Sequence, residues 1–405
     1  MLRLAIACLL AGALPFAANA AILNADSTNL LSVFAAARNG DTIKATGTFG
    51  SVALQNRTFT TRVILDATGA TFTDSLSIQN VTGLTVLRGT FGSRTAMLRT
   101  GRAVGINRSA NIKFQNATFI GNGPIAGSTA SIGMTVTASN QVQISASRFN
   151  NLKAGLGVLS STNVKIDSSK FTAMTSDGIN IADSHFVTAT ANTCVGTVPF
   201  AGAHPDCIQL WSVLGNPVQS DIALLRNIAR GATQGFTSFN SSDGGGLRIS
   251  MIGNIVATSY PQGLACYACV DSVFTDNVLT TLPGSLYQTS MNIIGGSNNI
   301  IENNNITRYA RPRPVDLIDL NLVTDGEEQI LSNSIDQLFL DDLALLQVDT
   351  LVPAVALVDE DNGPMILSRI GASAQTVPEP GVWAQLILGF GLVGAFTRRR
   401  VRTIA

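Results

Sequence analysis

An internal repeat constrains the fold of this chain more than any other feature. Four segments share one template, in which apolar residues alternate with polar ones and a small or amide residue precedes a closing apolar residue: NIKFQNATF from Asn111, QVQISASRF from Gln141, NVKIDSSKF from Asn163 and FVTATANTC from Phe186. A repeat of more than 20 residues that recurs along a chain predicts a solenoid.

The template also predicts how each unit is built. Alternation with period two indicates strands with one buried face, and Gly, Asn, Ser and Thr at the joints indicate turns. Such a unit cannot bury its own apolar face, but stacked units form a continuous core with parallel sheets along the rod. Asparagines before aliphatic residues recur farther on and predict a hydrogen-bonded ladder of stacked amides in the interior, at Asn227, Asn254, Asn277 and Asn305.

The segment before the first repeats predicts a short helix. Ser27 or Thr28 is suited to an N-cap, Leu30, Leu31 and Phe34 share a helical face, and Asn39-Gly40 ends the pattern. We expect this helix to plug the open end of the solenoid.

The helix, the following GDTI, a GTF strand and the repeated NV-x-I phrases resemble right-handed parallel β-helix proteins of the pectate-lyase-like type, which include polysaccharide lyases and mannuronan epimerases. The resemblance covers roughly residues 26 to 309. It implies an all-β chain with a right-handed parallel β-helix over residues 21–314. Because many functions occur on this fold, it does not by itself imply one activity.

Both ends of the chain resemble export signals. Residues 1–20 run from a basic start through an apolar core to Ala18-Asn19-Ala20, as in a cleavable signal peptide. Near the other end, residues 377–402 resemble the PEP-CTERM sorting signal of Gram-negative bacteria that make extracellular polysaccharide. The resemblance rests on an apolar segment from Val382 to Phe396, too short for a comfortable bilayer span, and on Pro378, Glu379, Pro380, Trp383, Arg398, Arg399 and Arg400.

That resemblance implies processing by an exosortase-type protease, a transient membrane association and a final place at the cell surface or in the extracellular matrix. Residues 315–376 lie before the signal and are acidic, with 12 Asp or Glu and no Lys or Arg between Asp316 and Asp361. This segment predicts degenerate final coils, a cap or a spacer. The body before it is basic, which favours an acidic partner, and no basic-aromatic cluster suggests nucleic acid.

Four cysteines remain after removal of the signal peptide. Their even number in an oxidising compartment favours disulfides. We predict a bond between Cys194 and Cys207 and a second candidate bond between Cys266 and Cys269.

Candidate site residues come from aligning strands that read as Gly or Cys followed by alternating aliphatic residues. The alignment places Asn180, Gln209 and Arg248 in an outward polar row, with Trp211 near its end. Asn180, Gln209 and Trp211 are therefore predicted to bind a sugar. Lys153, Asp177, His204, Asp206 and Arg248 are the predicted catalytic residues.

These side chains fit three kinds of chemistry. Uronate elimination or epimerisation needs a cation for the carboxylate, a base and an acid, roles open to Lys153, Arg248, His204 and an aspartate. Hydrolysis needs two carboxylates, such as Asp177 and Asp206. Calcium, the one cofactor considered, would need converging oxygens, for which Asp177, Asp183 and Asp206 are the candidates.

Two functions follow from these observations. The first is an exported β-helix protein that binds and modifies an extracellular acidic polysaccharide by lyase or epimerase chemistry, with His204 and Asp206 at its centre. The second is a non-catalytic structural or matrix-binding protein of the biofilm layer. The phrase HPDCIQLW resembles the H-x-D-x-I-Q phrase of carbohydrate-active β-helix proteins, but it provides no complete catalytic set.

Overall fold

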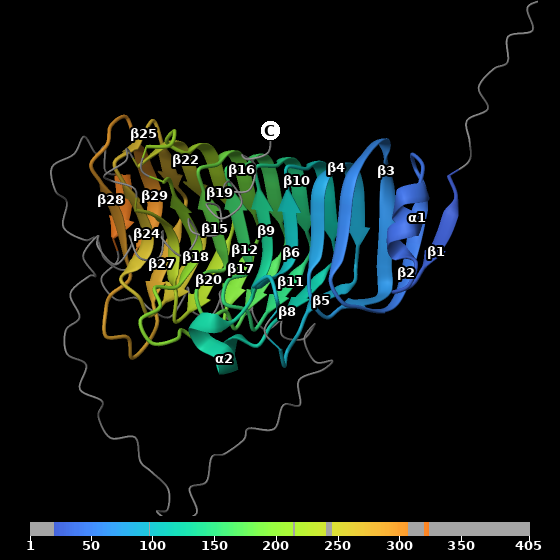
Figure 1. The fold of residues 1–405 in the computed structure, drawn as a ribbon. Helices are drawn as coiled ribbons and strands as arrows, with labels where there is room; N and C mark the ends of the chain where they lie inside the picture. Colours follow the sequence, from blue (N-terminus) through green and yellow to red (C-terminus); the bar gives the residue numbers. More distant parts are fainter. Residues whose placement is uncertain (1–19, 97, 214, 240–244, 307–319, 324–405) are drawn as a thin grey trace, which may run out of the picture. The chain divides into compact units, whose positions relative to one another are not determined.

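The computed structural model describes residues 20–96, 98–213, 215–239, 245–306 and 320–323. The chain divides into two compact units, residues 1–328 and 329–405, and all described residues belong to the first. In this unit the chain winds as a parallel β-solenoid, in which each repeated coil contributes one strand to each of three faces (Figure 1). The predicted all-β parallel β-helix is confirmed.

We name the three faces A, B and C in the order in which the chain visits them. The strands confined to face A are β6 (Arg102–Asn107), β9 (Ile132–Thr137), β12 (Leu156–Leu159), β15 (Ile179–Ala182), β18 (Asp206–Trp211), β21 (Gln234–Ser238), β24 (Gln262–Tyr267) and β28 (Ser290–Ile294). Those of face B are β7 (Ala110–Gln115), β10 (Asn140–Ser145), β13 (Thr162–Asp167), β16 (His185–Thr190), β19 (Ser220–Leu225), β22 (Gly246–Ile252), β25 (Cys269–Val270) and β26 (Val273–Thr275).

Face C consists of shorter strands, and longer strands at the two ends bend across corners. The face C strands are β5 (Thr90–Gly92), β8 (Thr118–Ile120), β11 (Arg148–Asn150), β14 (Lys170–Thr172), β17 (Thr193–Val195), β20 (Ile228–Gly231), β23 (Ile255–Thr258) and β27 (Val278–Thr281). The remaining strands are β1 (Ile22–Ala25), β2 (Thr42–Phe49), β3 (Val52–Phe72), β4 (Leu76–Leu87), β29 (Ile300–Ile306) and β30 (Leu320–Val323).

The predicted helix is present as α1 (Leu30–Ala36) at the start of the solenoid (Figure 1). Leu30 and Phe34 are buried, and the Phe34 ring meets Phe59 edge-on at 5.8 Å. Two details of the prediction are wrong. The N-cap residue is Asn29, without a side-chain cap bond, and Leu31 is 55% exposed because only one side of this short helix faces the core.

The predicted asparagine ladder runs along the corner between faces B and C. Its buried rungs are Asn192, Asn227, Asn254, Asn277 and Asn304. The side-chain amide of each of the first four donates to the Oδ1 of the next rung at 2.8–3.1 Å and to a backbone carbonyl. The last rung is Asn304 and not the predicted Asn305, because strand alternation turns Asn304 inward.

Rings of phenylalanine stack inside face C before the ladder begins. Neighbouring centroids are 4.3–5.4 Å apart along the row Phe49, Phe72, Phe91, Phe119, Phe149 and Phe171. The next position of the row, paired with Phe171, is Cys194. The aromatic stack therefore ends at the disulfide cysteine.

A row of glycines at the start of the face A strands makes room for these rings. A Cβ on Gly133 would lie 2.8 Å from the Phe149 ring, and a Cβ on Gly155 would lie 2.3 Å from Phe171. Cys207 follows Gly155 and Gly178 in this row. A side chain is tolerated at Cys207 because its coil carries Ala229 where earlier coils carry phenylalanine.

The last described strand, β30, pairs with β29 and belongs to the segment predicted as final coils, cap or spacer. The rest of that segment lies outside the described residues, as do residues 1–19. The predicted sorting signal, Pro378 to Arg400, lies there too. Among the residues that the structure describes, no helix is long and apolar enough to cross a membrane.

Candidate functional site

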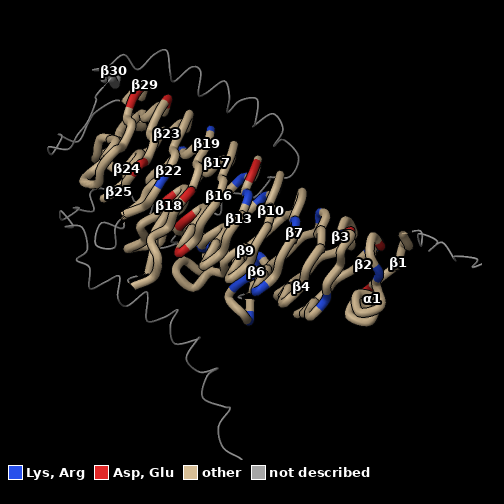
Figure 2. Tube along the Cα trace, turned by 90° about the horizontal axis from the view of Figure 1, so that it is seen from above, with Lys and Arg blue, Asp and Glu red and all other residues tan. Residues whose placement is uncertain are grey.

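The predicted residues gather where the chain enters face A from face C. In the parallel register, Asn180 lies beside Gln209, and the next strand places Gln234 beside Asp206 and Thr237 beside Gln209. Neighbouring parallel strands are about 4.8 Å apart, so side chains on β15, β18 and β21 are within reach of one another. Figure 2 shows Asp and Glu segments gathered beside β18.

His204 and Asp206 form the centre of the cluster. The His204 Nδ1 lies 3.1 Å from Asp206 Oδ2, and Thr237 Oγ1 donates to Asp206 Oδ1 at 2.6 Å. The Asp206 side chain is fully buried, whereas that of His204 is 39% exposed. Asp206 is therefore placed to orient His204, and His204 is the member that a ligand can reach.

The other ring nitrogen of His204 contacts the Gln234 side-chain amide, so both ring nitrogens have protein partners. The Gln234 Oε1 is buried and has no hydrogen-bond partner among the described residues. A buried polar atom without a partner costs about 1–3 kcal/mol. Such an atom is typical of a position that a ligand or a water completes.

Protonation of His204 is favoured by its surroundings. Burial lowers the pKa of His204, but the hydrogen bond to Asp206 and the negative charges of Asp206 and Asp177 outweigh it, so the pKa is raised. The residue is therefore poised to change its charge near neutral pH.

Asp177 is the second accessible acid-base group. Its Oδ1 accepts from the Asp206 backbone N–H at 3.0 Å, and its Oδ2 accepts from Asn180 Nδ2 at 3.3 Å. Burial in the protein and the charge of Asp206 raise the pKa of Asp177 to about 7. The side chain remains partly exposed at the surface of face A. A carboxyl group of this kind can hold a proton at neutral pH and donate it.

The three predicted sugar-binding residues contact one another. Asn180 Nδ2 donates to Gln209 Oε1 at 3.0 Å, and Trp211 Nε1 donates to Asn180 Oδ1. They form an uncharged strip beside the acidic cluster, with a partly exposed indole at its end.

Lys153 lies at the near edge of the cluster. It precedes β12, one coil before Asp177, and its Nζ is 6.0 Å from the centre of the Phe200 ring. Phe200 belongs to the loop that carries His204.

Arg248 lies elsewhere, so the strand alignment that placed it beside Gln209 is wrong. It belongs to β22 on face B, where its Nε and Nη2 donate to Asp221 at 2.6 and 2.8 Å. The strand beside β18 is β21. Among the described residues, no ion pair joins Asp177 or Asp206 to a lysine or an arginine.

Asp183 is also separated from the cluster, because it follows β15 whereas Asp177 precedes it. Its carboxylate accepts from the Val213 N–H at 2.7 Å and from Asn216 Nδ2 at 2.8 Å. The three aspartates considered for calcium do not converge. Among the described residues, no group of three or more His, Cys, Asp or Glu side chains is placed to hold a metal ion.

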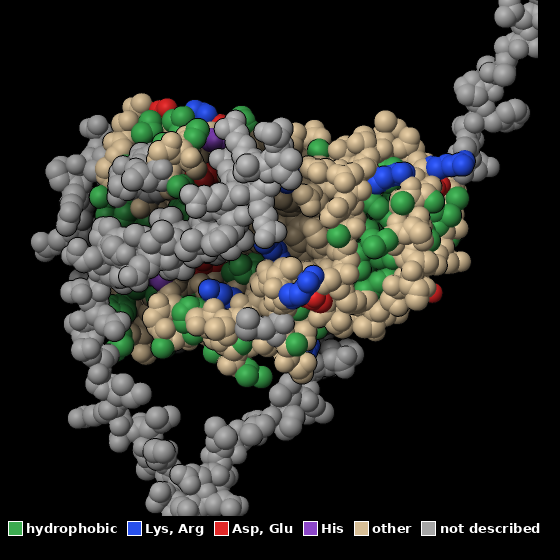
Figure 3. Space-filling model, in the orientation of Figure 1, with side chains coloured by type: hydrophobic (Ala, Val, Ile, Leu, Met, Phe, Trp, Pro, Cys, Tyr) green, Lys and Arg blue, Asp and Glu red, His purple; other side chains and the backbone are tan. Residues whose placement is uncertain are grey.

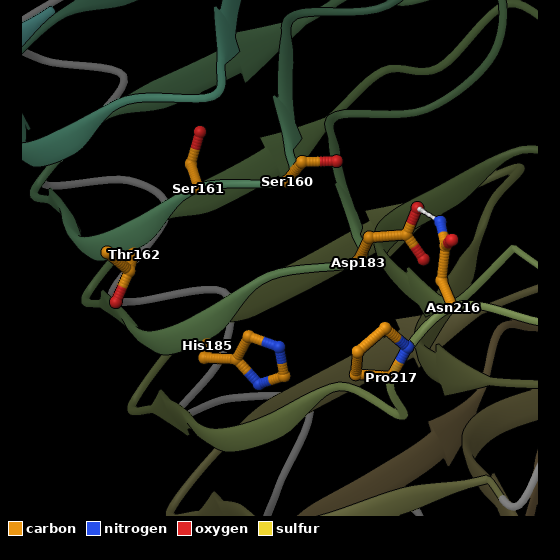
Figure 4. Close-up of a pocket in the computed structure, with 7 residues that line it drawn as sticks. All are labelled: Ser160, Ser161, Thr162, Asp183, His185, Asn216 and Pro217. Atoms are coloured by element: carbon orange, nitrogen blue, oxygen red, sulfur yellow. Dashed lines mark hydrogen bonds between the residues drawn. The ribbon is translucent and has the colours of Figure 1, made fainter. Parts of the chain in front are cut away.

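Asp183 instead lines an open hollow of about 310 Å³ at the corner between faces A and B (Figure 4). Its lining consists of Ser160, Ser161, Thr162, Asp183, His185, Asn216 and Pro217. His185 begins β16, and its Nδ1 lies 2.9 Å from Ser220 Oγ.

A disulfide fixes the loop that carries His204. Cys194 and Cys207 are bonded, with their Cα atoms 5.6 Å apart, and the closed loop spans a separation of 13 residues. This predicted bond is confirmed, as is the second, between Cys266 and Cys269. The Cys194–Cys207 bond links β17 to the start of β18, and it therefore constrains both ends of the loop that carries His204.

Sequence reasoning missed four residues of the site. They are Gln234, Thr237, Phe239, whose ring meets His204 edge-on at 5.7 Å, and Tyr260. Burial and the nearby charge of Asp206 raise the pKa of Tyr260, which keeps its hydroxyl protonated at neutral pH. The only sequence signal for the strand at Gln234–Ser238 is the alternation in QGFTS. This segment lacks the alternating aliphatic residues after Gly or Cys on which the strand alignment was based.

No protein-family model and no curated protein sequence matches the chain. Among solved structures, it is similar to the surface protein and adhesin PfbA of Streptococcus pneumoniae, with 13% identity over 71% of this chain and 88% of that chain and a TM-score of 0.52. It is also similar to the PL6 family alginate lyase AlyGC, with 11% identity over 76% of this chain and 52% of that chain and a TM-score of 0.51. Identities this low show a shared fold.

Proposed function

We propose that this chain binds a linear polysaccharide along face A and cleaves it by acid-base chemistry at Asp177 and His204. The observation that carries the proposal is the contact network that brings Asp177, Asp206 and His204 together on neighbouring coils, beside the uncharged strip of Asn180 and Gln209. The proteins of similar structure include both an alginate lyase and an adhesin, which is compatible with a carbohydrate-directed role.

In this proposal, protonated Asp177 donates its proton to the glycosidic oxygen of the leaving sugar. Neutral His204, oriented by buried Asp206, accepts a proton from the attacking water, and the new C–O bond forms as the glycosidic bond breaks. Gln234 must release the His204 Nε2 for this step. Thr237 is a positioning residue, because it touches only the far oxygen of Asp206.

Hydrolysis fits the cluster better than uronate elimination. Elimination or epimerisation requires a positive group at the sugar carboxylate next to the reacting carbon. The predicted cation Arg248 is engaged by Asp221 on face B, and Lys153 lies at the edge of the cluster beside Phe200. The negative charge of Asp206 would repel a uronate at the reacting position. The lyase and epimerase alternatives therefore become less favoured than hydrolysis.

The test incubates the protein with alginate, polygalacturonate, xylan and the host exopolysaccharide while reducing ends and unsaturated uronate are measured. We expect reducing ends without unsaturated products. Activity should fall above about pH 7 as Asp177 loses its proton, and it should also fall at lower pH as His204 becomes protonated and can no longer accept a proton. Asp177→Asn and His204→Gln should each lower kcat by about 100-fold or more. The matched control is Arg248→Ala, which should keep full activity.

Unsaturated uronate as the product would replace hydrolysis with elimination. If all four polymers stay intact with the wild-type protein, the catalytic proposal fails for this panel, and the second candidate gains. That candidate is a non-catalytic glycan-binding surface protein. It is favoured by the finding that both His204 ring nitrogens are already engaged by the protein, as in a structural brace.

We also propose that the chain is exported and sorted to the cell surface. The signal-like residues 1–20 and the PEP-CTERM-like residues 377–402 support this, and two disulfides suit an oxidising compartment. Mass spectrometry of the mature protein from its host should find a new N-terminus near Ala21 and a C-terminus near Pro378. Retention of both segments in the mature surface protein would contradict this.

A further inference from the structure

Face A changes its chemistry along the rod. In one register row at the entrance of its strands stand Arg102, Ile132, Ala154, Asp177, Asp206, Gln234 and Gln262. The row has one cation, Arg102, at its beginning, where Asp74 precedes it by one coil; two apolar residues follow, the middle is acidic and the end carries amides. Figure 2 likewise shows Lys and Arg segments beside β6 and β9 and Asp and Glu segments beside β18.

The Arg102 side chain lies flat on the surface of face A, over β6 and β9. Its Nη1 donates to Thr135 Oγ1 at 2.9 Å, and its side chain passes over Gly105, where an added Cβ would lie 3.4 Å from Arg102 Cδ. Gly105, Thr135 and Gly157 form a second, outward-facing row next to the entrance row. A Cβ added to Gly157 would have only an atom of Thr135 within 4 Å. The outward residues between Arg102 and the acidic cluster, Gly105, Thr135 and Gly157, are therefore small, and we call this stretch of face A the cationic trough.

Lys153 stands at the other end of this trough, about 10 Å from Arg102 along the rod, because two coil spacings of about 4.8 Å separate them. Among the described residues, neither cation belongs to an ion pair within 4.0 Å. Asp74, which lies one coil before Arg102 in the same register row, is engaged by Ser51 and Arg99. Both cations can therefore meet an anionic ligand without breaking a salt bridge.

One rim of the trough is formed by loops at the corner between faces C and A. Helix α2 (Gly123–Ala126) and the turn η1 (Gly127–Thr129) follow β8. Gly123 N–H donates to the Asn151 carbonyl at 2.5 Å, and Thr175 Oγ1 donates to the Gly127 carbonyl at 3.3 Å. The rim thus spans the coils between the cations and the His204 loop. Figure 3 shows Lys and Arg side chains on the side of the molecule that faces the reader in Figure 1.

The far end of face A is different. Asn292 Nδ2 donates to Gln262 Oε1, and Gln262 Nε2 donates to Tyr267 Oη at 3.1 Å. These groups are uncharged hydrogen-bonding partners for neutral sugars, and Phe239 connects them to His204 through edge-on ring contacts. Within the described part of face A, Arg102 and Lys153 both lie on the β6 side of the acidic cluster, and the β24 side carries these uncharged groups.

We propose that the cationic trough is an anionic-sugar subsite, in which Arg102 and Lys153 bind carboxylate or sulfate groups of the polysaccharide away from the reacting bond. This rests on the proposed function, because the bond to be cleaved is placed at Asp177. The ligand is a polysaccharide with acidic residues on the Arg102 side and an uncharged residue at Asp177. The two cations discriminate between polymers, whereas the aspartates and His204 perform the reaction.

The test measures dissociation constants by affinity electrophoresis in gels that contain polygalacturonate, carrageenan or neutral xylan. The parent is the full chain with Asp177→Asn, so that cleavage cannot deplete the polymer. Arg102→Gln with Lys153→Gln should weaken binding to at least one acidic polymer about tenfold and leave xylan binding unchanged. Added salt should reduce this difference. Polygalacturonate and carrageenan distinguish a carboxylate from a sulfate ligand.

The matched control replaces two exposed cations on the other faces, Arg148→Gln on face C with Lys165→Gln on face B. An equal loss in the control pair would show general charge attraction and overturn the subsite, as would unchanged binding in the Arg102 and Lys153 variant. A parent that binds xylan but no acidic polymer would also overturn it, without touching the proposed cleavage. Conversely, binding that follows the expected pattern in a protein without cleavage activity would uphold the subsite and refute the reaction.

Discussion

The asparagine ladder and the acidic cluster occupy two corners of the same coils, and both are rows of buried polar side chains. In the ladder, each of the first four amides donates to the next rung and to a backbone carbonyl. In the cluster, Asp206 is fully buried, the pKa of Asp177 is raised, and Gln234 Oε1 has no partner among the described residues. Burial is common to both corners, but satisfied hydrogen bonding is not.

The difference teaches which corner stabilises the fold and which one destabilises it. A buried polar group stabilises a fold only when its hydrogen bonds replace those to water. The ladder meets this condition at every step and holds the coils in register. The cluster holds two carboxyl groups, Asp177 and Asp206, and the unpaired Gln234 Oε1 in surroundings that are partly shielded from solvent. Such burial is unfavourable for folding but suits groups that transfer protons.

The largest expected effect comes from breaking the ladder. Asn254→Leu leaves the Asn227 backbone N–H and the Leu224 carbonyl without their side-chain partners. We expect the free energy of unfolding to fall by about 3–4 kcal/mol, measured by urea denaturation. The control is Asn140→Ala, which removes the exposed acceptor of the Asn163 amide and should change stability by less than about 0.5 kcal/mol. Similar losses in both variants would show that burial does not distinguish the ladder.

A somewhat smaller effect is expected from the disulfide next to the cluster. Cys194→Ala with Cys207→Ala opens a 13-residue closure and should cost about 3 kcal/mol or less, measured in the same way. Amide exchange should rise in residues 196–205 and stay unchanged at Asn227, because the bond fixes the His204 loop and not the ladder. Uniformly faster exchange at both corners would contradict this separation.

The aromatic stack provides a second variant of the same site. Cys194→Phe with Cys207→Gly restores the phenylalanine and glycine pairing of earlier coils, since Gly178 already leaves space over residue 194. The new ring can stack on Phe171, so we expect this variant to recover about half of the lost stability. If this variant is no more stable than the double alanine variant, a phenylalanine at position 194 does not extend the stack even when glycine at position 207 makes room for it.

The fold was predictable because its determinants recur locally. Period-two alternation, the phenylalanines at one place of the repeat and the asparagines at another each report on a position within a single coil. Predicting Asn305 in place of Asn304 as the last rung shows the limit of this reasoning, since one residue of register decides which side chain turns inward.

The site was predictable only in part, because it depends on which strand lies beside which. His204, Asp206, Asn180 and Gln209 belong to adjacent strands whose phrases match, and they were placed together correctly. Arg248 was assigned to the wrong face, because its strand carries the familiar Gly-Leu-x-Ile phrase, whereas the true neighbour reads QGFTS. Thr237 carries no chemical signal in the sequence, and only the register shows that it reaches Asp206.

The smallest expected effect has the opposite sign from the ladder substitution. The raised pKa values of Asp177 and His204 mean that the folded state holds both protons more tightly than the unfolded state. Wild-type stability should therefore fall as pH rises from about 4 to 8. Asp177→Asn removes the aspartate contribution, so it should match the wild type near pH 4 and exceed it by about 1–2 kcal/mol at pH 8, after allowance for solvent screening.

Thermal unfolding at the two pH values tests this prediction, and Asp221→Asn is the matched control. The hydrogen bond from Arg248 lowers the pKa of Asp221, so the ionised form stabilises the folded state, and this contribution is lost on acidification. Its replacement should slightly destabilise the protein at pH 8, opposite to Asp177→Asn. If both substitutions destabilise the protein at pH 8, Asp177 is a satisfied structural group like a rung of the ladder, and the two corners are alike after all.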